Sequence, residues 1–366
     1  MIKYRLKLIL IFFTTVAIFF YFDISRSLGQ KSVAFSIGKG ITDVAGIKVG
    51  HHTLKQRPTG CTAILVEQGA VAGVDVRGFA PGTRETALLD PVNTVQEIHG
   101  ISLAGGSAFG LDAASGVVRY LEAQERGFPV GKFKIPIVPA AILFDLQVSD
   151  REVEAELHHP KIRPNNDCGY QAAKNATSGQ VLEGNVGVGA GATVGKLLGI
   201  ERAMKSGVGT YSVTLANGIE VGAIVAVNAV GSVVDPRTGN VIAGIRTESG
   251  KELLDAEEIL QQLETSTIDF GQNTTIGVVA TNAALSQAQV TQLARMAQSG
   301  VTRSIIPSHT PLDGDTLFAV ATGKLNSGNV TEIGSWAAEV TSRAIIRAVT
   351  SSEGIADYPG VNDLLK

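Results

Sequence analysis

The chain has 366 residues, of which 44% are hydrophobic and 18% are charged, so it can build one large core or two smaller ones. Its formal net charge is −3 with both signs dispersed, which argues against a nucleic-acid-binding protein. Glycine is frequent, at 42 residues, and this favours closely packed elements joined by tight turns.

The N-terminus has the plan of a secretory signal peptide. A basic head precedes an apolar run at residues 8–22, and a small-x-small cleavage site ends at Gly29. A membrane anchor is the alternative, although the run is shorter than the roughly 20 residues that a spanning helix needs. Residues 1–29 are therefore predicted to be a signal peptide or membrane anchor. Residues 30–366 are predicted to be a single exported domain, periplasmic or extracellular.

Apolar patterning in the first half of this domain predicts a mixture of strands and helices. The expected strands cover residues 62–76 and 135–146, and the expected helices cover residues 111–124 and 170–177. Ser107 is predicted to cap the first helix. Residues 147–167 are hydrophilic and are expected to form an exposed excursion.

In the second half, residues 211–234 are expected to form two strands around Asn217-Gly218, a dipeptide that suits a tight hairpin turn. Residues 248–272 are charged and linker-like, with one amphipathic piece. Strands are then expected at residues 275–281 and 316–322, and helices at residues 286–299 and 333–350. This order of elements predicts a layered α+β architecture.

Glycine-rich segments do not complete a nucleotide site. Residues 187–196 fail as a phosphate-binding P-loop, because Ala190 stands where glycine is needed and Leu197 where serine or threonine is needed. The same segment is a weak match to a dinucleotide fingerprint. After Gly105, Phe109 occupies the position where a nucleophile elbow needs glycine. No cofactor is therefore expected.

The cysteines and histidines do not form a metal-binding pattern. Cys61 and Cys168 belong to no Cys-x-x-Cys or Cys/His cluster, and neighbouring histidines such as His51-His52 point in different directions. No metal site is predicted. An exported protein could pair the two cysteines, but the sequence does not set their separation.

The most informative segment is residues 271–281, where a polar stretch ends at Asn273-Thr274 and a β-branched apolar run follows at once. If the peptide bond before Thr274 were cut, this residue would carry both a nucleophilic hydroxyl and a free α-amine. An α-amine titrates near about 7.7–8.0, so it can accept the hydroxyl proton at neutral pH. The alternative is an ordinary strand that begins after a turn.

Four other polar residues are candidates for the same site. Asp313 and Asp315 share a face if their segment is extended, and could then hold an ammonium or orient the nucleophile. A solvated Asp-Gly turn is the alternative. Lys196 follows a glycine run and is equally compatible with a surface lysine. Asn228 lies in an apolar strand, where an unpaired amide would cost roughly 1–3 kcal/mol. It is either a structural hydrogen bonder or an oxyanion donor.

Together these residues resemble the self-processing L-aminopeptidase/D-esterase family, which includes β-aminopeptidases and nylon-oligomer hydrolases. The resemblance covers residues 40–323 and rests on blocks that occur in one order. These are residues 82–86, 105–116, 186–196, 225–236, 273–281 and 307–316. It implies a four-layer α-β-β-α sandwich and a precursor that cuts itself between Asn273 and Thr274. The large chain (residues 30–273) and small chain (274–366) would stay together and assemble into homo-oligomers of processed pairs.

The resemblance also implies roles for the candidate residues. Thr274 would be the nucleophile, Asn228 would lie in the oxyanion region, and Lys196 would support charge at the site. Asp313 and Asp315 would orient the nucleophile's neighbourhood. The aminopeptidase members usually have serine and glutamate at these two aspartate positions. Thr274 with two aspartates is therefore similar to the nylon-oligomer hydrolase branch.

Residues 138–145 depart from the aminopeptidase pattern. In those members the equivalent strand carries a glutamate that binds the substrate's free amine and a tyrosine near the oxyanion, whereas this chain offers Phe144 and Asp145. A buried ammonium without a counter-charge is costly. Phe144 and Asp145 are thus the predicted substrate-binding residues. Either Asp145 replaces the missing glutamate, or the substrate is an internal amide.

The resulting hypothesis is an exported hydrolase of small peptides or amides, aminopeptidase-like or acting on oligoamides. It would work through an acyl-enzyme on Thr274 with no cofactor and no nucleic-acid partner. An N-acyltransferase of the ornithine acetyltransferase type is a second hypothesis, but the Ala-Thr-Met type cleavage site is absent. A non-catalytic homologue is a third, and the joint presence of all five candidate residues argues against it.

Overall fold

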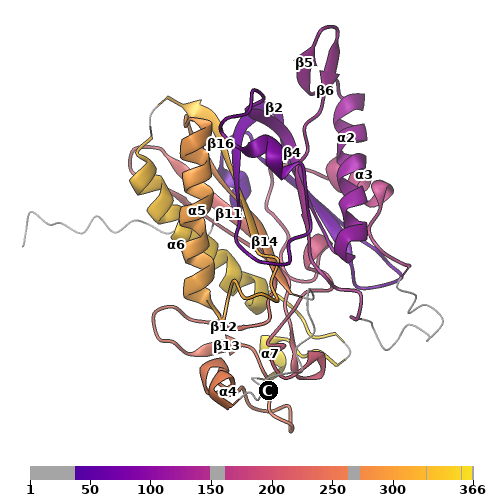
Figure 1. The fold of residues 1–366 in the computed structure, drawn as a ribbon, viewed down its shortest axis with the longest axis vertical. Coiled ribbons are helices and arrows are strands. Elements are labelled where there is room, and N and C mark those ends of the chain that lie inside the picture. Colours follow the sequence, from indigo (N-terminus) through magenta and orange to yellow (C-terminus); the bar gives the residue numbers. More distant parts are fainter. Residues whose placement is uncertain (1–37, 149–160, 263–272, 327, 356, 365–366) are drawn as a thin grey trace, which may run out of the picture. The chain divides into compact units, whose positions relative to one another are not determined.

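The computed structural model describes residues 38–148, 161–262, 273–326, 328–355 and 357–364. Its main feature is a nine-stranded mixed sheet in the order β10-β11-β14-β16-β2-β4-β7-β3, with β1 paired to β2 (Figure 1). The strands are β1 (Lys48–Thr53), β2 (Gly60–Val76), β3 (Thr83–Arg84), β4 (Glu97–Ala104), β7 (Ala140–Ile142), β10 (Val208–Thr214), β11 (Glu220–Asn228), β14 (Thr274–Ala283) and β16 (Thr316–Leu325).

The long strand β2 runs through two layers of this sheet. Residues 60–65 pair with β1 and β4, and residues 71–76 pair with β16. The register shifts between Leu65 and Ala70, and such irregularities bend and twist a strand. β2 therefore carries the chain from one sheet layer into the other.

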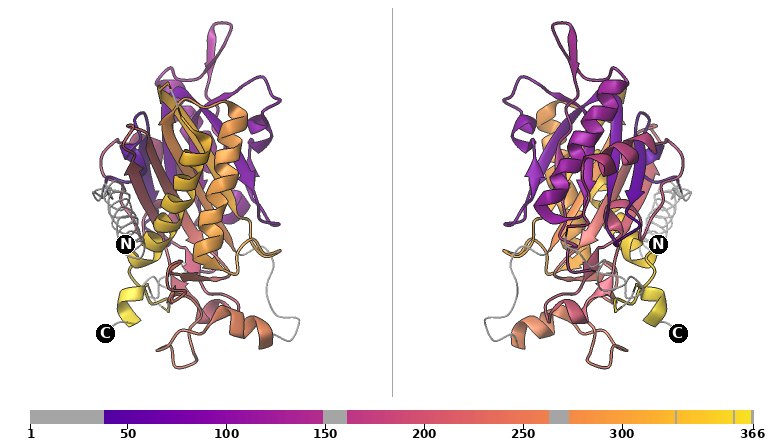
Figure 2. Two further views of the ribbon diagram at one scale, coloured as in Figure 1. Left: turned by 90° about the vertical axis from the view of Figure 1, so that its left-hand side faces the viewer. Right: turned by 90° about the vertical axis from the view of Figure 1, so that its right-hand side faces the viewer.

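Helices cover both outer faces of the sheet layers (Figures 1 and 2). On one side, α5 (Gln287–Ser304) and α6 (Val330–Thr350) pack against β10, β11, β16 and the second half of β2. On the other side, α2 (Ala113–Ala123) and α3 (Asn166–Lys174) pack against β1, β2 and β4. Smaller elements complete the described fold: β5 (Phe128–Val130), β6 (Phe133–Ile135), β8 (Thr193–Val194), β9 (Met204–Lys205), β12 (Ser232–Val234), β13 (Val241–Ala243), β15 (Ile305–Ile306), α4 (Ala256–Gln262) and α7 (Val361–Leu364).

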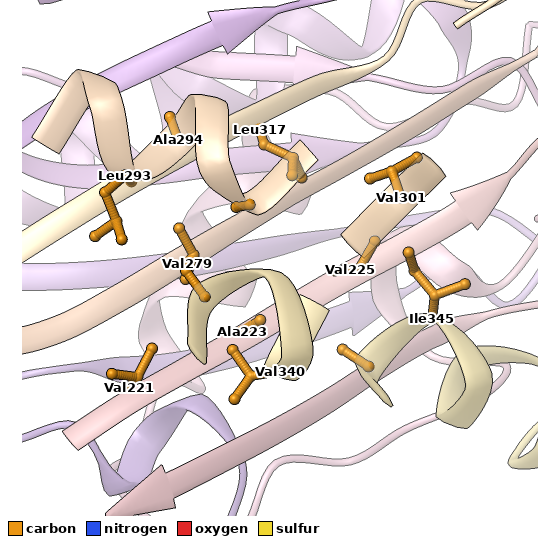
Figure 3. Packing of buried hydrophobic residues seen from close by; sticks show 14 of the residues in the cluster. Val221, Ala223, Val225, Val279, Leu293, Ala294, Val301, Leu317, Val340 and Ile345 are labelled. Atoms are coloured by element: carbon orange, nitrogen blue, oxygen red, sulfur yellow. The ribbon is translucent and has the colours of Figure 1, made fainter. Parts of the chain in front are cut away.

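Three separate hydrophobic clusters establish the order of the layers. Alternate side chains of β11, such as Val221 and Val225, join Val340 and Ile345 of α6 in one outer cluster (Figure 3). The intervening Ile224 belongs to an inner cluster shared by both sheet layers. A third cluster joins α2 and α3 to β1, β2 and β4. The predicted α+β four-layer α-β-β-α sandwich is confirmed.

Local sequence signals explain where several helices begin. Ser286 and Gln289 form a reciprocal capping box at the start of α5, as their three-residue spacing favours. The side chain of Asn329 caps α6 by accepting hydrogen bonds from two backbone N–H groups. Asn165 caps α3, so this helix begins at Asn166 rather than at the expected residue 170.

Two local expectations are wrong. The strand expected at residues 135–146 is divided, because β6 ends at Ile135 and β7 has only three residues. Pro136 and Pro139 lie between them, and proline has no N–H to donate to a sheet. Ser107 does not cap α2. It has a φ of +56° and begins a short 3₁₀ segment instead, with no side-chain cap.

Cys61 in β2 and Cys168 in α3 form a disulfide that ties an outer helix to the sheet. The sequence left this pairing open. No helix in the described part of the chain is both long and apolar enough to cross a bilayer. The predicted leader at residues 1–29 lies outside the described residues, as do parts of the expected segments at residues 147–167 and 248–272.

Candidate active site

Thr274 is the first residue of β14 and is 3% exposed. β14 pairs antiparallel with β11, which places Thr274 opposite Asn228 at the end of β11. The Thr274 hydroxyl donates to the carbonyl oxygen of Asn273, so it already touches the group that self-cleavage would attack.

The two aspartates reach Thr274 because β16 runs parallel to β14. The segment that leads into β16 therefore lies beside the segment that leads into β14, with Asn273 bridged to Asp313. The backbone N–H of Thr275 donates to Asp315 Oδ1 over 2.6 Å. The structure thus brings Asp313 and Asp315 beside Thr274, and both are almost fully buried.

Burial, and after it the neighbouring negative charge of Asp315, raise the pKa of Asp313 to about 6. Hydrogen bonds oppose this effect. Thr310 donates to Asp313 Oδ2 through both its hydroxyl (2.6 Å) and its backbone N–H (3.0 Å). Asp313 can therefore change its charge close to neutral pH.

Lys196 and Asn228 lie together next to this strand end. The Lys196 Nζ donates to the backbone carbonyl of Asn228 at 3.0 Å and to its Oδ1 at 2.9 Å. Desolvation lowers the pKa of Lys196 to about 7, against the opposing pull of Asp313 and Asp145. Lys196 is thus a buried residue and not the surface lysine that was the alternative.

The side-chain amide of Asn228 is held by several groups. Its Oδ1 also accepts from the backbone N–H of Thr193 at 3.1 Å, and its Nδ2 donates to the carbonyl oxygen of Phe144 at 2.9 Å. Phe144 therefore reaches the site through its main chain. These bonds fix the orientation of the amide in an otherwise apolar strand.

Asp145 does not fit its predicted role of binding a substrate amine. It is fully buried and forms an ion pair with Arg57. Its carboxylate also accepts from Thr59 Oγ1 at 2.6 Å and from the backbone N–H of Gly106 at 2.9 Å. Because both oxygens have internal partners, the geometry favours a structural role. Phe144 is half-buried, and contact of its ring with a substrate stays a prediction.

Two residues near the site were missed by the sequence reasoning. The Nδ1 atom of His309 is hydrogen-bonded to Asp315 Oδ2 at 2.8 Å. The backbone N–H of His309 donates to the same oxygen at 3.2 Å. Nothing in its local sequence separates it from a loop histidine. Its only signal was a place within the family block at residues 307–316.

Lys205 in β9 is the second missed residue. It is 0% exposed, and its Nζ donates to the carbonyl oxygens of Gly189, Ala192 and Ser206. Desolvation lowers its pKa to about 7, and Asp145 acts in the opposite direction. Lys205 therefore holds the glycine-rich segment that leads to Thr193. An isolated lysine in a mixed segment gives no sequence signal of such burial.

A cavity of about 860 Å³ lies elsewhere, between α5, the end of β2 and residues 86–93. Val74, Asp75 and Arg295 are among its lining residues, and Thr274 is not. The chemistry-bearing side chains converge at the strand end and not in this cavity. Within the described residues, no group of three or more His, Cys, Asp or Glu side chains could hold a metal ion.

A family model and curated relatives match most of this chain. The family model described as Peptidase family S58 matches residues 39–362. An uncharacterized aminopeptidase of Mycobacterium tuberculosis is 42% identical over 351 residues, which cover 88% of this chain and 97% of the relative. A 6-aminohexanoate-oligomer endohydrolase of Paenarthrobacter ureafaciens is 30% identical, with 89% of each chain covered.

Solved structures support the fold. A β-aminopeptidase of Burkholderia sp. superposes with a TM-score of 0.64 at 23% identity, covering 93% of this chain and 97% of its own. The L-aminopeptidase D-Ala-esterase/amidase of Ochrobactrum anthropi gives a TM-score of 0.65 at 20% identity, covering 88% and 90%. The latter is described as a variant of the Ntn hydrolase fold.

Proposed function

We propose that this chain, which belongs to peptidase family S58 and is a peptide or amide hydrolase, works as an N-terminal-nucleophile enzyme whose nucleophile, Thr274, is released by self-cleavage after Asn273. One observation carries the proposal. The hydroxyl of Thr274 is buried against the carbonyl of Asn273, beside two carboxylates, a lysine and an asparagine that the fold collects from distant segments.

Self-cleavage begins when Thr274 Oγ1 attacks the carbonyl carbon of Asn273. A carbon–oxygen bond forms, the carbon–nitrogen bond breaks, and the hydroxyl proton ends on the departing nitrogen of Thr274. The product is an ester between Asn273 and the Thr274 side chain. Water then hydrolyses this ester, which leaves a carboxylate on Asn273 and restores the Thr274 hydroxyl beside a new α-amine.

In substrate hydrolysis the new α-amine takes the hydroxyl proton as Thr274 attacks the substrate carbonyl. The acyl group passes to Oγ1, the leaving amine receives the proton, and water releases the acid in the second half of the cycle. Asn228, whose Oδ1 accepts from Lys196 Nζ, would donate from its side-chain amide in the oxyanion region. The carboxylates of Asp313 and Asp315 would hold the new α-amine of Thr274 close to the Oγ1 atom of the same residue.

The proposed substrates are small peptides or oligoamides. The relatives named above are an aminopeptidase and an endohydrolase of 6-aminohexanoate oligomers. Because Asp145 is engaged by Arg57, it offers no evident counter-charge for a substrate ammonium. This supports cleavage of internal amides. Rates on N-blocked and free-amine forms of one oligoamide would separate the two modes, and a strict need for the free amine would contradict this preference.

The test of the nucleophile is a pair of substitutions. Thr274→Ala should remain one uncut chain without hydrolase activity, because it has no hydroxyl. Thr274→Ser should cut itself and keep activity, because it retains a hydroxyl on the same atom. Denaturing mass spectrometry and N-terminal sequencing of the small fragment provide the readout. An uncut wild-type chain that still hydrolyses amides would refute the proposal.

Export and assembly are also proposed. The disulfide between Cys61 and Cys168 supports an oxidising compartment, since such bonds persist there. The mature protein would begin near Gln30 if the leader is removed, and would form homo-oligomers of processed pairs. Fractionation of cells, sequencing of the mature N-terminus and light scattering would test these statements.

A further inference from the structure

Two groups that donate hydrogen bonds to the carbonyl of Asn273 matter for self-cleavage. One is the Thr274 hydroxyl, which must give up its proton when it attacks. The other is the backbone N–H of Gly314, at 2.9 Å. During self-cleavage the negative charge develops on this carbonyl oxygen. A donor at 2.7–3.1 Å from that oxygen is suitably placed to stabilise the charge.

We infer that the backbone N–H of Gly314 is the oxyanion donor of self-cleavage, a role distinct from that of Asn228. This inference rests on the proposed function. It separates the two reactions of Thr274: Gly314 stabilises the oxyanion when the chain cuts itself, and Asn228 belongs to the oxyanion region of the substrate.

The peptide group that contains this N–H is held from both ends. Its N–H donates to Asn273, and its carbonyl, which belongs to Asp313, accepts from the backbone N–H of Ala80 at 2.9 Å. The carbonyl of Asp315 accepts in turn from the N–H groups of Arg77 and Gly78. A donor fixed in this way needs little reorganisation as charge develops.

Only glycine fits at position 314. A Cβ atom there would lie 2.5 Å from the carbonyl oxygen of Ala80 and 3.0 Å from Thr274 Oγ1. The first contact is with backbone and cannot be relieved by a side-chain rotation. The absence of a side chain thus lets the peptide approach both the scissile carbonyl and the nucleophile.

Asn228 is committed to other partners in the uncut chain. Its Nδ2 donates to the carbonyl of Phe144, and its Oδ1 accepts from Thr193 and Lys196. Gly314, whose N–H donates to the Asn273 carbonyl, is thus the group that the geometry assigns to the developing charge of self-cleavage.

The direct test replaces Gly314 with glycolic acid by cell-free translation, which exchanges the N–H for an ester oxygen without adding an atom. Self-cleavage should slow about 100- to 1000-fold, the loss typical of one oxyanion donor. The matched control is glycolic acid at Gly239, whose N–H donates to Asp235 at 2.8 Å in an open turn. Mass spectrometry follows formation of the fragment that begins at Thr274.

A second ester keeps the test decisive if the first protein folds poorly. Lactic acid in place of Ala80 removes the N–H that holds the Asp313 carbonyl but leaves the Gly314 N–H in place. Cleavage should slow by roughly tenfold, because the donor is less firmly held. Resistance to trypsin under native conditions reports folding of each protein.

The outcomes separate this inference from the proposed function. If wild-type chain stays uncut, the proposed function fails. If wild-type chain cuts itself and the esters at positions 314 and 80 cut as fast as the ester at 239, only the inference fails. The variant Asn228→Asp, which lacks the side-chain amide donor, tests the competing assignment. If self-cleavage stops in Asn228→Asp but proceeds normally with the ester at position 314, the oxyanion donor is Asn228 and not Gly314.

Discussion

At the scale of single residues, the site is a set of buried ionisable groups whose charges change near neutral pH. Asp313 is shifted to a pKa of about 6, and Lys196 and Lys205 to about 7, each mainly by loss of contact with water. Such values make protonation a measurable part of how the site works.

The first prediction concerns the acid limb of the hydrolysis rate. The rate should rise through about pH 6, because in the proposed mechanism an ionised Asp313 orients the Thr274 amine. Thr310→Val removes a hydroxyl hydrogen bond that favours the ionised form, so the limb should move to higher pH by roughly one unit. Thr310→Ser keeps the hydroxyl and serves as control. An unmoved limb in Thr310→Val would contradict this assignment to Asp313.

The second prediction concerns Lys205 and stability. Its folded pKa lies below the usual lysine value of 10.5. Between pH 7 and 10.5 the unfolded chain therefore binds more protons than the folded chain, and this group's contribution to stability increases with pH. It is fully present above about pH 10.5, decreases as the pH falls below that value, and is fully lost below about pH 7. The free energy of unfolding of wild type should thus rise relative to Lys205→Met between pH 7 and 9.5.

The measurement is urea unfolding at several pH values. Between pH 7 and 9.5, the free energy of unfolding of wild type should rise by a few kcal/mol relative to that of Lys205→Met. This is the size expected for one group with a strongly shifted pKa. Lys55→Met is the matched control, since Lys55 is exposed and should show no such trend. A pH-independent difference between wild type and Lys205→Met would show that Lys205 does not titrate in this range.

The candidate site could be predicted only in part. Thr274, Asp313 and Asp315 are visible as polar residues at the heads of strands, and parallel pairing of β14 and β16 then brings them together. The partners of Asp145 are not visible, because Arg57 and Thr59 come from a segment about 90 residues earlier that meets it only in the fold. The same is true of Lys205, whose partners are backbone carbonyls.

At the scale of elements, the disulfide links α3 to β2, and its two cysteines are 107 residues apart in the sequence. Closing a loop of this length restricts the unfolded chain and contributes up to about 4–5 kcal/mol. The double variant Cys61→Ala/Cys168→Ala should therefore melt at a lower temperature than the oxidised protein. Wild type with reductant should approach the melting temperature of the variant. Equal melting temperatures in all three samples would contradict a formed bond.

Element prediction succeeded where one periodic signal dominated. The Asn217-Gly218 hairpin joins β10 and β11 as expected, and the helices α5 and α6 follow their apolar stripes and polar caps. It failed around residues 135–146, where apolar composition suggested one strand and two prolines divided it. A run of apolar residues indicates burial, and sheet pairing also requires available N–H groups.

At the scale of the whole molecule, the layer order was implied by the family resemblance and is confirmed by three hydrophobic clusters. Composition and periodicity alone predicted only layered α+β structure. The bend that lets β2 serve both sheet layers was not predicted, because residues 62–76 were expected to form one strand. The polar segment Glu67-Gln68-Gly69 lies where the register shifts.

The position of β14 and β16 within the sheet has a consequence if the proposed self-cleavage occurs. Both strands come from residues 274–366, yet their flanking neighbours, β11 and β2, come from residues before the proposed cleavage site. In the sheet, the two strands of the shorter polypeptide would therefore lie between strands of the longer one and pair with them on both sides. They should co-elute in size-exclusion chromatography and come apart only in denaturant. Scission would then free an amine without freeing a fragment.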